Sequence, residues 1–194
     1  MKLLKYLLIL QMIFLIACQE DKIDTSEGKK TTQELKNKIE SIDSISYAGL
    51  EDVFSNTSLL ETDNKPIMII FGKNNCSYCE KLKKDIQIDS NLKELIKNNF
   101  KSYYINISYS KDHDIKFLNK VMDTNSLATY FNVKGTPLTI WFEQNGNKIL
   151  KLEGYDKKYF IAALNFIESN EYKKENAFEK RLQLFSKKIM NQAQ

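Results

Sequence analysis

Short apolar runs mark the strands of this chain. Three runs are rich in β-branched and aromatic residues and predict buried strands at 66–71, 102–107 and 138–142. A fourth run, at 148–152, follows across Gln144-Asn145-Gly146-Asn147. Asn-Gly between two apolar runs is a strong local signal for a β-hairpin. The last two runs are therefore expected to pair antiparallel.

Apolar residues recur at helical spacing in much of the chain between and after these runs. Four helices are expected. The first is opened by Cys76, with Cys79, Leu82 and Ile86 inward, and the second lies around 91–98. The third is capped by Thr124, with Leu127, Ala128 and Phe131 on one face, and the fourth is capped by Asp156, with Phe160, Ile161, Leu164 and Ile167 inward. A polar loop from Ser108 to Asp114 and a further helical piece are expected before Thr124. This alternation predicts an α/β domain over 46–169, with a mixed central sheet flanked by helices.

The end of the chain, 170–194, predicts one more helix. Its apolar residues fall at intervals of four, three and four, and they are Phe178, Leu182, Phe185 and Ile189. Such a stripe packs either on its own domain or on a partner. We expect it to lie on its own domain.

The N-terminal segment 1–17 has the pattern of an export signal. Lys2 and Lys5 precede an apolar stretch that is too short for a stable membrane span. The stretch ends in Leu15-Ile16-Ala17-Cys18, which resembles the bacterial lipobox, in which the cysteine is acylated. The expectation is a lipoprotein signal peptide over 1–17 and lipid attachment at Cys18. A signal peptide that merely ends in cysteine, or an uncleaved anchor helix, is the alternative.

Residues 18–45 predict a tether followed by a short helix. The tether is charged and poor in large apolar residues, and Leu35, Ile39 and Ile42 then recur at helical spacing. Removal of the leader takes away two lysines, so the formal charge falls from +4 to +2. Charges of both signs are interspersed, which argues against a nucleic-acid partner.

Three cysteines occur in the chain, and lipid attachment at Cys18 leaves Cys76 and Cys79. Disulfides form and persist outside the cytosol, so a CxxC pair in an exported protein can take part in thiol–disulfide exchange. A cysteine at the start of a helix faces unpaired backbone N–H groups, which favour its thiolate. Cys76 is therefore expected to be the exposed nucleophile and Cys79 the less accessible resolving thiol. Tyr78, between them, is expected to be exposed and to contact substrate, whereas Trp141 is expected in the core.

Together, Pro66 to Asp85, Gly135-Thr136-Pro137 and the closing hairpin and helix resemble the thioredoxin fold. The resemblance implies that Pro137 is a cis-proline beside the CxxC pair and that Thr136 contacts an extended substrate. Tyrosine before the second cysteine and threonine before the proline are more similar to the periplasmic disulfide isomerases and the exported SoxW-type thioredoxins. The isomerases' dimerisation domain has no counterpart here, so a monomer is expected.

The chain also departs from the thioredoxin pattern. Asn75 stands where thioredoxins usually have tryptophan, and Ile70 stands where they carry a buried acid. The spacing from Cys76 to Pro137 is longer than in a minimal thioredoxin. An extra helix between 89 and 125 is therefore expected.

The leading hypothesis is a membrane-tethered thiol–disulfide oxidoreductase that reduces or isomerises disulfides of exported proteins without a bound cofactor. A membrane electron donor would recycle it, facing the periplasm or, in a Gram-positive cell, the exterior. One alternative is a metal-binding CxxC protein, although the single histidine, His113, is expected at the surface. The other is a binding lipoprotein whose CxxC disulfide is only a staple.

Overall fold

The computed structural model describes residue 41 and residues 43–191, all of which belong to the unit Lys38–Gln194. The expected signal peptide, Cys18, the tether and most of the short helix before Ser46 lie outside the described residues. Within the described part of the chain, no helix combines the length and the apolar character needed to cross a membrane.

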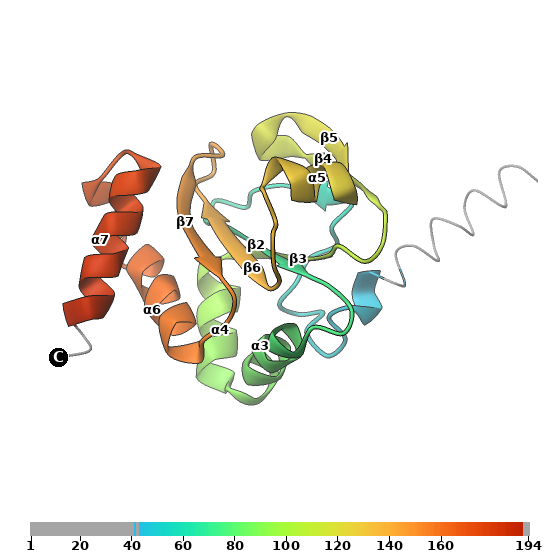
Figure 1. Cartoon of the computed structure of the whole chain (residues 1–194), viewed down its shortest axis with the longest axis horizontal. Helices are drawn as coiled ribbons and strands as arrows, with labels where there is room; N and C mark the ends of the chain where they lie inside the picture. The colour runs from blue at the N-terminus through green and yellow to red at the C-terminus, as the bar shows by residue number, and fades with distance from the viewer. Residues whose placement is uncertain (1–40, 42, 192–194) are drawn as a thin grey trace, which may run out of the picture. The chain divides into compact units, whose positions relative to one another are not determined.

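A four-stranded mixed sheet forms the centre of the domain (Figure 1). Its order is β3-β2-β6-β7, and the strands are β2 (Ile67–Gly72), β3 (Lys101–Asn106), β6 (Leu138–Phe142) and β7 (Lys148–Glu153). β2 pairs parallel with β3 and antiparallel with β6, and β6 pairs antiparallel with β7. The predicted strands and the final hairpin are thus confirmed.

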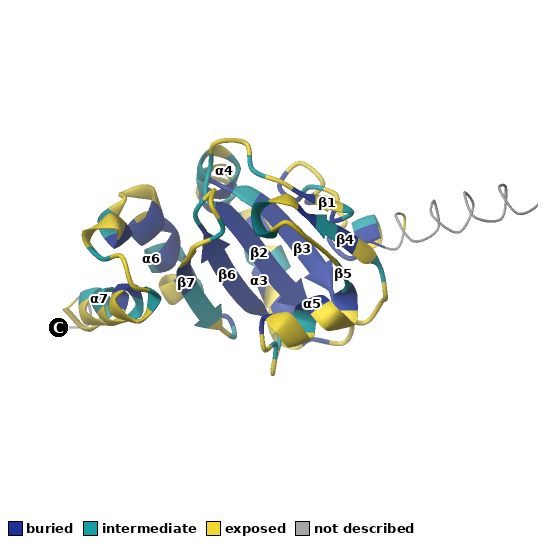
Figure 2. Ribbon diagram, turned by 90° about the horizontal axis from the view of Figure 1, so that it is seen from above, coloured by how far each residue is buried: buried dark blue, intermediate teal, exposed yellow. Residues whose placement is uncertain are grey.

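Helices cover both faces of this sheet, as Figure 2 shows from above. The helices are α3 (Ser77–Ile88), α4 (Ser90–Asn99), α5 (Thr124–Tyr130) and α6 (Lys157–Glu168). Alternate residues of β2 point to opposite faces, so Met68 and Ile70 pack with α3, α4 and α6 while Phe71 packs with α5. Trp141 is fully buried, in the same cluster as Met68 and Ile70. The α/β class and the position of Trp141 are confirmed.

Between β3 and α5, the expected polar loop from Ser108 to Asp114 is correct only as far as Lys111, and the expected extra helical piece is wrong. This segment forms β4 (Asp112–Ile115), the 3₁₀ turn η1 (Lys116–Leu118) and β5 (Lys120–Asp123), and β4 pairs parallel with the short β1 (Leu59–Leu60). In β4 the side chains of His113 and Ile115 are buried while their neighbours face outward. This alternation is typical of a strand, but it is not evident in the sequence because one of the two inward residues of β4 is polar. The cap of α5 also differs by one residue, because Asp123 accepts from the N–H groups of Asn125 and Ser126.

The C-terminal helix α7 (Phe178–Asn191) follows η2 (Glu171–Lys174) and lies beside α6 and β7 (Figure 1). Phe185 is buried, and Leu182 and Ile189 pack against the same cluster. Arg181 is 4% exposed and donates to Glu143 and to the carbonyls of Lys148 and Glu175. The apolar stripe therefore covers its own domain, as expected.

Candidate active site

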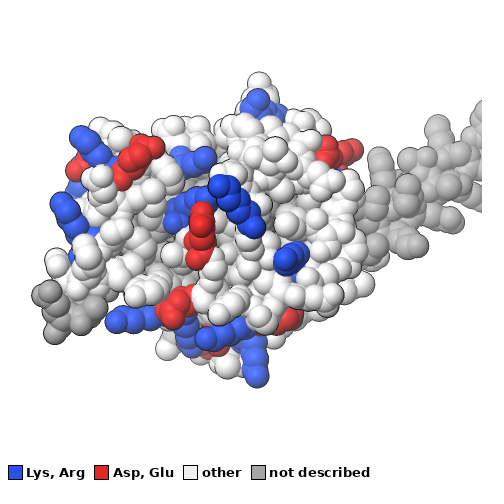
Figure 3. Space-filling model, in the orientation of Figure 1, with Lys and Arg blue, Asp and Glu red and all other residues white. Residues whose placement is uncertain are grey.

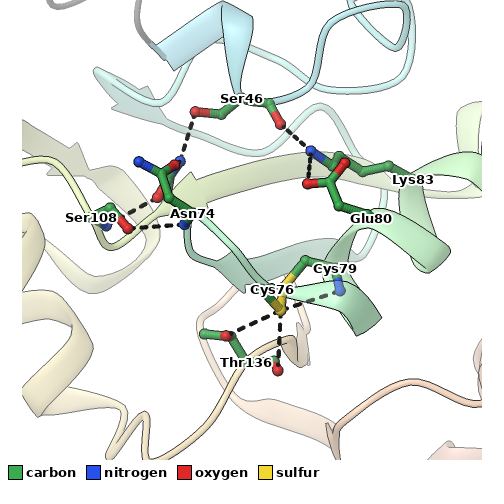
Figure 4. The surroundings of a disulfide bond; sticks show 9 residues. Ser46, Asn74, Cys76, Cys79, Glu80, Lys83, Ser108 and Thr136 are labelled. Atoms are coloured by element: carbon green, nitrogen blue, oxygen red, sulfur yellow. Dashed lines mark hydrogen bonds and ion pairs between the residues drawn. A yellow bond between two sulfur atoms is a disulfide. The ribbon is translucent and has the colours of Figure 1, made fainter.

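The CxxC pair lies at the start of α3, after β2 and a short loop (Figure 4). Cys76 is the N-cap of the helix, and its Sγ lies 3.2 Å from the backbone N of Cys79. The two cysteines form a disulfide, with their Cα atoms 5.2 Å apart. The side chain of Cys76 is 6% exposed and that of Cys79 is fully buried. The expected order of accessibility holds, but Cys76 is much less exposed in the disulfide form than predicted.

Thr136 approaches the same sulfur from the opposite side (Figure 4). The Thr136–Pro137 peptide bond is cis, as the resemblance implied. Both Oγ1 and the carbonyl oxygen of Thr136 lie 3.4 Å from Cys76 Sγ. A disulfide sulfur or a thiolate has no proton to donate, so in those states the Thr136 hydroxyl is the donor of this pair. The contact of Thr136 and Pro137 with substrate remains a prediction.

The loop before Cys76 is held by polar side chains that the sequence reasoning did not single out. The backbone N–H of Asn74 donates to Ser108 Oγ, at 2.9 Å. Its side-chain Oδ1 accepts from Asn106 Nδ2, at 2.8 Å, and its Nδ2 donates to Tyr109 Oη, at 2.8 Å. Asn106 lies within the strand expected at 102–107, between Ile105 and Ile107. Nothing in the sequence marked it as a partner of the active-site loop.

Charged and aromatic groups lie on the other side of the disulfide, along α3. Lys83 pairs with Glu80 at 2.8 Å, donates to the carbonyl of Ser46 at 2.9 Å, and lies 5.6 Å from the centre of the Tyr104 ring. Burial, and secondly the charge of Glu80, raise the pKa of Tyr104, so the phenol stays protonated at neutral pH. These residues, with Asn75, Asn106 and Tyr109, line a groove of about 500 Å³ beside the cysteines.

Ile70 does not offer a proton acceptor for Cys79. Its side chain is fully buried among apolar residues, opposite Tyr104 of β3 and Thr139 of β6. Asn75 has a positive φ of 55°, a conformation that asparagine tolerates better than most residues. Tyr78 is 58% exposed, as predicted.

Comparison with known proteins agrees with this geometry. The profile of the thioredoxin-like domain family matches residues 54–168. A thioredoxin-fold protein from Helicobacter pylori is 38% identical, with 77% of this chain and 99% of that chain covered and a TM-score of 0.68. The chain belongs to the thioredoxin-like family. A thioredoxin from Thermus thermophilus is 17% identical over 53% of this chain and 73% of that chain, with a TM-score of 0.42. Curated protein sequences gave no match.

Membership of the thioredoxin-like family and the CxxC pair at disulfide distance together support thiol–disulfide redox chemistry. The helix start offers Cys76 a backbone donor, and Thr136 offers it a hydroxyl. Both donors stabilise a sulfur that carries negative charge more than a neutral one. The arrangement can therefore form a reactive thiolate at Cys76 and hold a second thiol within bonding reach.

His113 is not the surface residue that was expected. It is 1% exposed, with Nδ1 2.6 Å from the carbonyl oxygen of Thr57 and Nε2 3.0 Å from Thr124 Oγ1. Burial lowers the pKa of its imidazole. Among the described residues, no group of three or more His, Cys, Asp and Glu side chains could hold a metal ion. His113 instead ties β4 to the segment before β1 and to α5.

Charge on the domain surface is mixed. On the face in Figure 3, Lys and Arg side chains are interspersed with Asp and Glu side chains. Across the described residues several charged side chains are paired, such as Lys157 with Asp89 at 2.9 Å. This face offers no extended field of one sign.

Proposed function

We propose that this protein is a membrane-tethered thiol–disulfide oxidoreductase that reduces or isomerises disulfides in exported proteins. The observation that carries the proposal is the placement of Cys76 Sγ. It lies at the N-cap of α3, 3.2 Å from the Cys79 backbone N and 3.4 Å from Thr136 Oγ1. A cysteine that served only in a structural disulfide would need neither of these hydrogen-bond donors.

The reduced chain would act in two exchange steps. The Cys76 thiolate attacks one sulfur of a substrate disulfide, forms a mixed disulfide and releases the other substrate sulfur as a thiolate. The Cys79 thiolate then attacks Cys76 Sγ, closes the Cys76–Cys79 disulfide and releases the second substrate thiolate. Two electrons pass from the dithiol to the substrate, and the protons lost by the two cysteines balance those taken up by the released thiolates. No bound cofactor is required.

The proposed tethering rests on the lipobox-like sequence that ends at Cys18. Acyl chains on this residue would hold the domain at a membrane, facing the periplasm or the cell exterior. After each turnover the disulfide would be reduced by a membrane electron donor that carries a dithiol. Tyr78, Thr136 and Pro137 would contact the substrate chain. The protein is proposed to act as a monomer, without nucleic acid.

The reduction potential of the Cys76–Cys79 couple tests this function. The full chain, in detergent, is equilibrated in glutathione or dithiothreitol buffers and its cysteine peptides are analysed by mass spectrometry, which separates Cys18 from the pair. A value near or below about −270 mV supports a reductase, and a value near about −120 mV identifies an oxidant and overturns the proposed direction. A pair that cannot be cycled would overturn the redox function and leave a binding lipoprotein.

A second measurement tests the assignment of Cys76 as the nucleophile and Cys79 as the resolving thiol. The Cys79→Ala chain should accumulate a mixed disulfide with a model disulfide protein, because the resolving thiol is absent. The Cys76→Ala chain should accumulate none. Equal trapping by the two variants would contradict the assignment of Cys76 as the nucleophile.

A further inference from the structure

We propose that Asn106 is a positioning residue that holds the loop before Cys76, and through this loop the attacking sulfur, in its reactive geometry. The inference rests on the proposed function and adds a residue that does not contact either cysteine. It is carried by hydrogen bonds from Asn106, at the end of β3, to Asn74 before the cysteines and to Ser46, whose carbonyl accepts from Lys83 of α3; Figure 4 labels Asn74, Ser46 and Lys83.

Asn106 ends β3 and is 9% exposed. Its Nδ2 donates to Asn74 Oδ1 at 2.8 Å and to Ser46 Oγ at 3.0 Å, and its Oδ1 accepts from the N–H of Ser108 at 3.0 Å. The amide thus uses both hydrogens and its oxygen. An amide with three directed bonds fixes its partners in orientation as well as in distance.

Asn74 is the point at which this network reaches the active-site loop. Its backbone N–H and both side-chain polar atoms bond to Ser108, Tyr109 and Asn106. All three partners come from the end of β3 and the turn after it. Asn75 then adopts its positive φ, and Cys76 follows directly as the cap of α3. The position of Asn74 therefore limits where Cys76 can lie.

Ser46 extends the same network to the helix side of the disulfide. Its hydroxyl accepts from Asn106, and its carbonyl accepts from Lys83, one turn beyond Cys79 on α3. Lys83 is in turn paired with Glu80. The CxxC segment thus lies between Asn74, which bonds to Asn106 directly, and Lys83, which is linked to Asn106 through Ser46.

Movement of the loop before Cys76 would change the hydrogen bonds that Cys76 Sγ accepts. Cys76 Sγ has the Cys79 N–H on one side and the Thr136 hydroxyl on the other. A loop that moves by a fraction of an ångström lengthens one of these bonds, and each bond stabilises the thiolate more than the thiol. Loosening the loop should therefore reduce the thiolate fraction without removing any group that touches the sulfur.

The test compares alkylation of reduced Cys76 by iodoacetamide across pH in full-length variants, with the modified cysteine identified from fragment masses. Asn106→Ala and Asn74→Ala are each expected to shift the midpoint upward and to slow the reaction at pH 6 by about threefold. Because the Asn106–Asn74 bond is lost in either variant, the double variant should be slowed by less than the roughly ninefold of independent effects. Ser108→Ala, which removes one bond to the loop, should give a smaller shift in the same direction.

Asn147→Ala, at an exposed hairpin turn away from the cysteines, is the matched control and should leave the rate unchanged. Thermal unfolding of every variant separates positioning from stability. A purely structural role predicts a lower midpoint of unfolding with normal alkylation, and that result in Asn106→Ala and Ser108→Ala would overturn the inference. An additive, ninefold effect in the double variant would overturn the shared path. Failure of the wild-type chain to cycle between disulfide and dithiol would refute the redox function instead.

Discussion

Thr136 supplies a hydroxyl at the sulfur of Cys76, and this contact can be removed with little change of shape. Thr136→Val keeps the branched side chain but loses the donor at 3.4 Å. Because the lost bond favours the thiolate, we expect alkylation of Cys76 at pH 6 to slow by about threefold. Thr136→Ser keeps the hydroxyl and should react at close to the wild-type rate. Equal rates in the two variants would show that the hydroxyl does not stabilise the thiolate.

His113 gives the fold a pH dependence whose sign can be worked out. Burial lowers the pKa of the folded imidazole, whereas in the unfolded chain it titrates near 6.5. Between these two values the unfolded state binds more protons, so the free energy of unfolding falls as pH drops below about 6.5, by at most about 1.4 kcal/mol per pH unit. Urea titrations between pH 5 and 8 measure this slope. His113→Gln should flatten it, and an unchanged slope would assign the dependence to other groups.

The cysteine pair and the cis bond were easier to predict than the surroundings of single polar residues. Cys76, Cys79 and the cis bond at Pro137 could be read from a short spacing and a family pattern. Asn106 and His113 could not, because a polar residue that is buried by contacts far along the chain looks the same in sequence as one in solvent. The two hydrogen-bond partners of His113, Thr57 and Thr124, lie on either side of it in the chain, and neither is a close neighbour in sequence.

At the scale of elements, α7 has a role that the structure makes specific. Phe185 is 5% exposed, and its ring centre lies 5.4 Å from that of Phe166 in α6. Truncation of a buried aromatic ring leaves a cavity, so Phe185→Ala should lower the free energy of unfolding by about 3 kcal/mol. Met190→Ala, at a side chain that is 60% exposed on the same helix, should change it by less than about 0.5 kcal/mol. Urea denaturation measures both.

The same substitution distinguishes support of the fold from support of the site. α7 lies against β7 and α6, whereas Cys76 is contacted by Cys79 and Thr136. Phe185→Ala should therefore leave the alkylation rate of Cys76 unchanged while it lowers stability. A slower alkylation in the folded variant would mean that α7 also affects the site.

Elements with strong local signals were predicted, and the β4–β5 hairpin was not. Asn145-Gly146 marked the β6–β7 hairpin, and Asp156 marked the start of α6. The β4–β5 hairpin carried no such signal, because only Ile115 is an apolar inward residue of β4 and no residue of β5 is buried; the parallel partner of β4, β1, lies far earlier in the chain. The expected extra helix was inferred from spacing alone, and a longer spacing accommodates strands equally well.

For the molecule as a whole, the folding free energies of the oxidised and reduced forms give an independent measure of redox direction. A disulfide that closes so short a loop removes little entropy from the unfolded chain, about 2 kcal/mol in the loop-closure model. A thiolate stabilised in the fold opposes this difference, since it stabilises the reduced form alone. If the protein is a reductase, the opposing contribution is small, and the oxidised chain should be the more stable by up to about 2 kcal/mol.

Urea denaturation of the full chain with and without a reductant measures this difference, and the Cys76→Ala chain serves as a control in which reductant should have no effect. A strong oxidant is one whose reduced form is the more stable. If the reduced chain resists urea better than the oxidised chain, the direction proposed here is wrong, although the exchange chemistry at Cys76 and Cys79 would stand. The same experiment on Asn106→Ala tests its positioning role through the stability of the whole molecule. If Asn106 stabilises the thiolate by holding the loop, its loss should destabilise the reduced form more than the oxidised form.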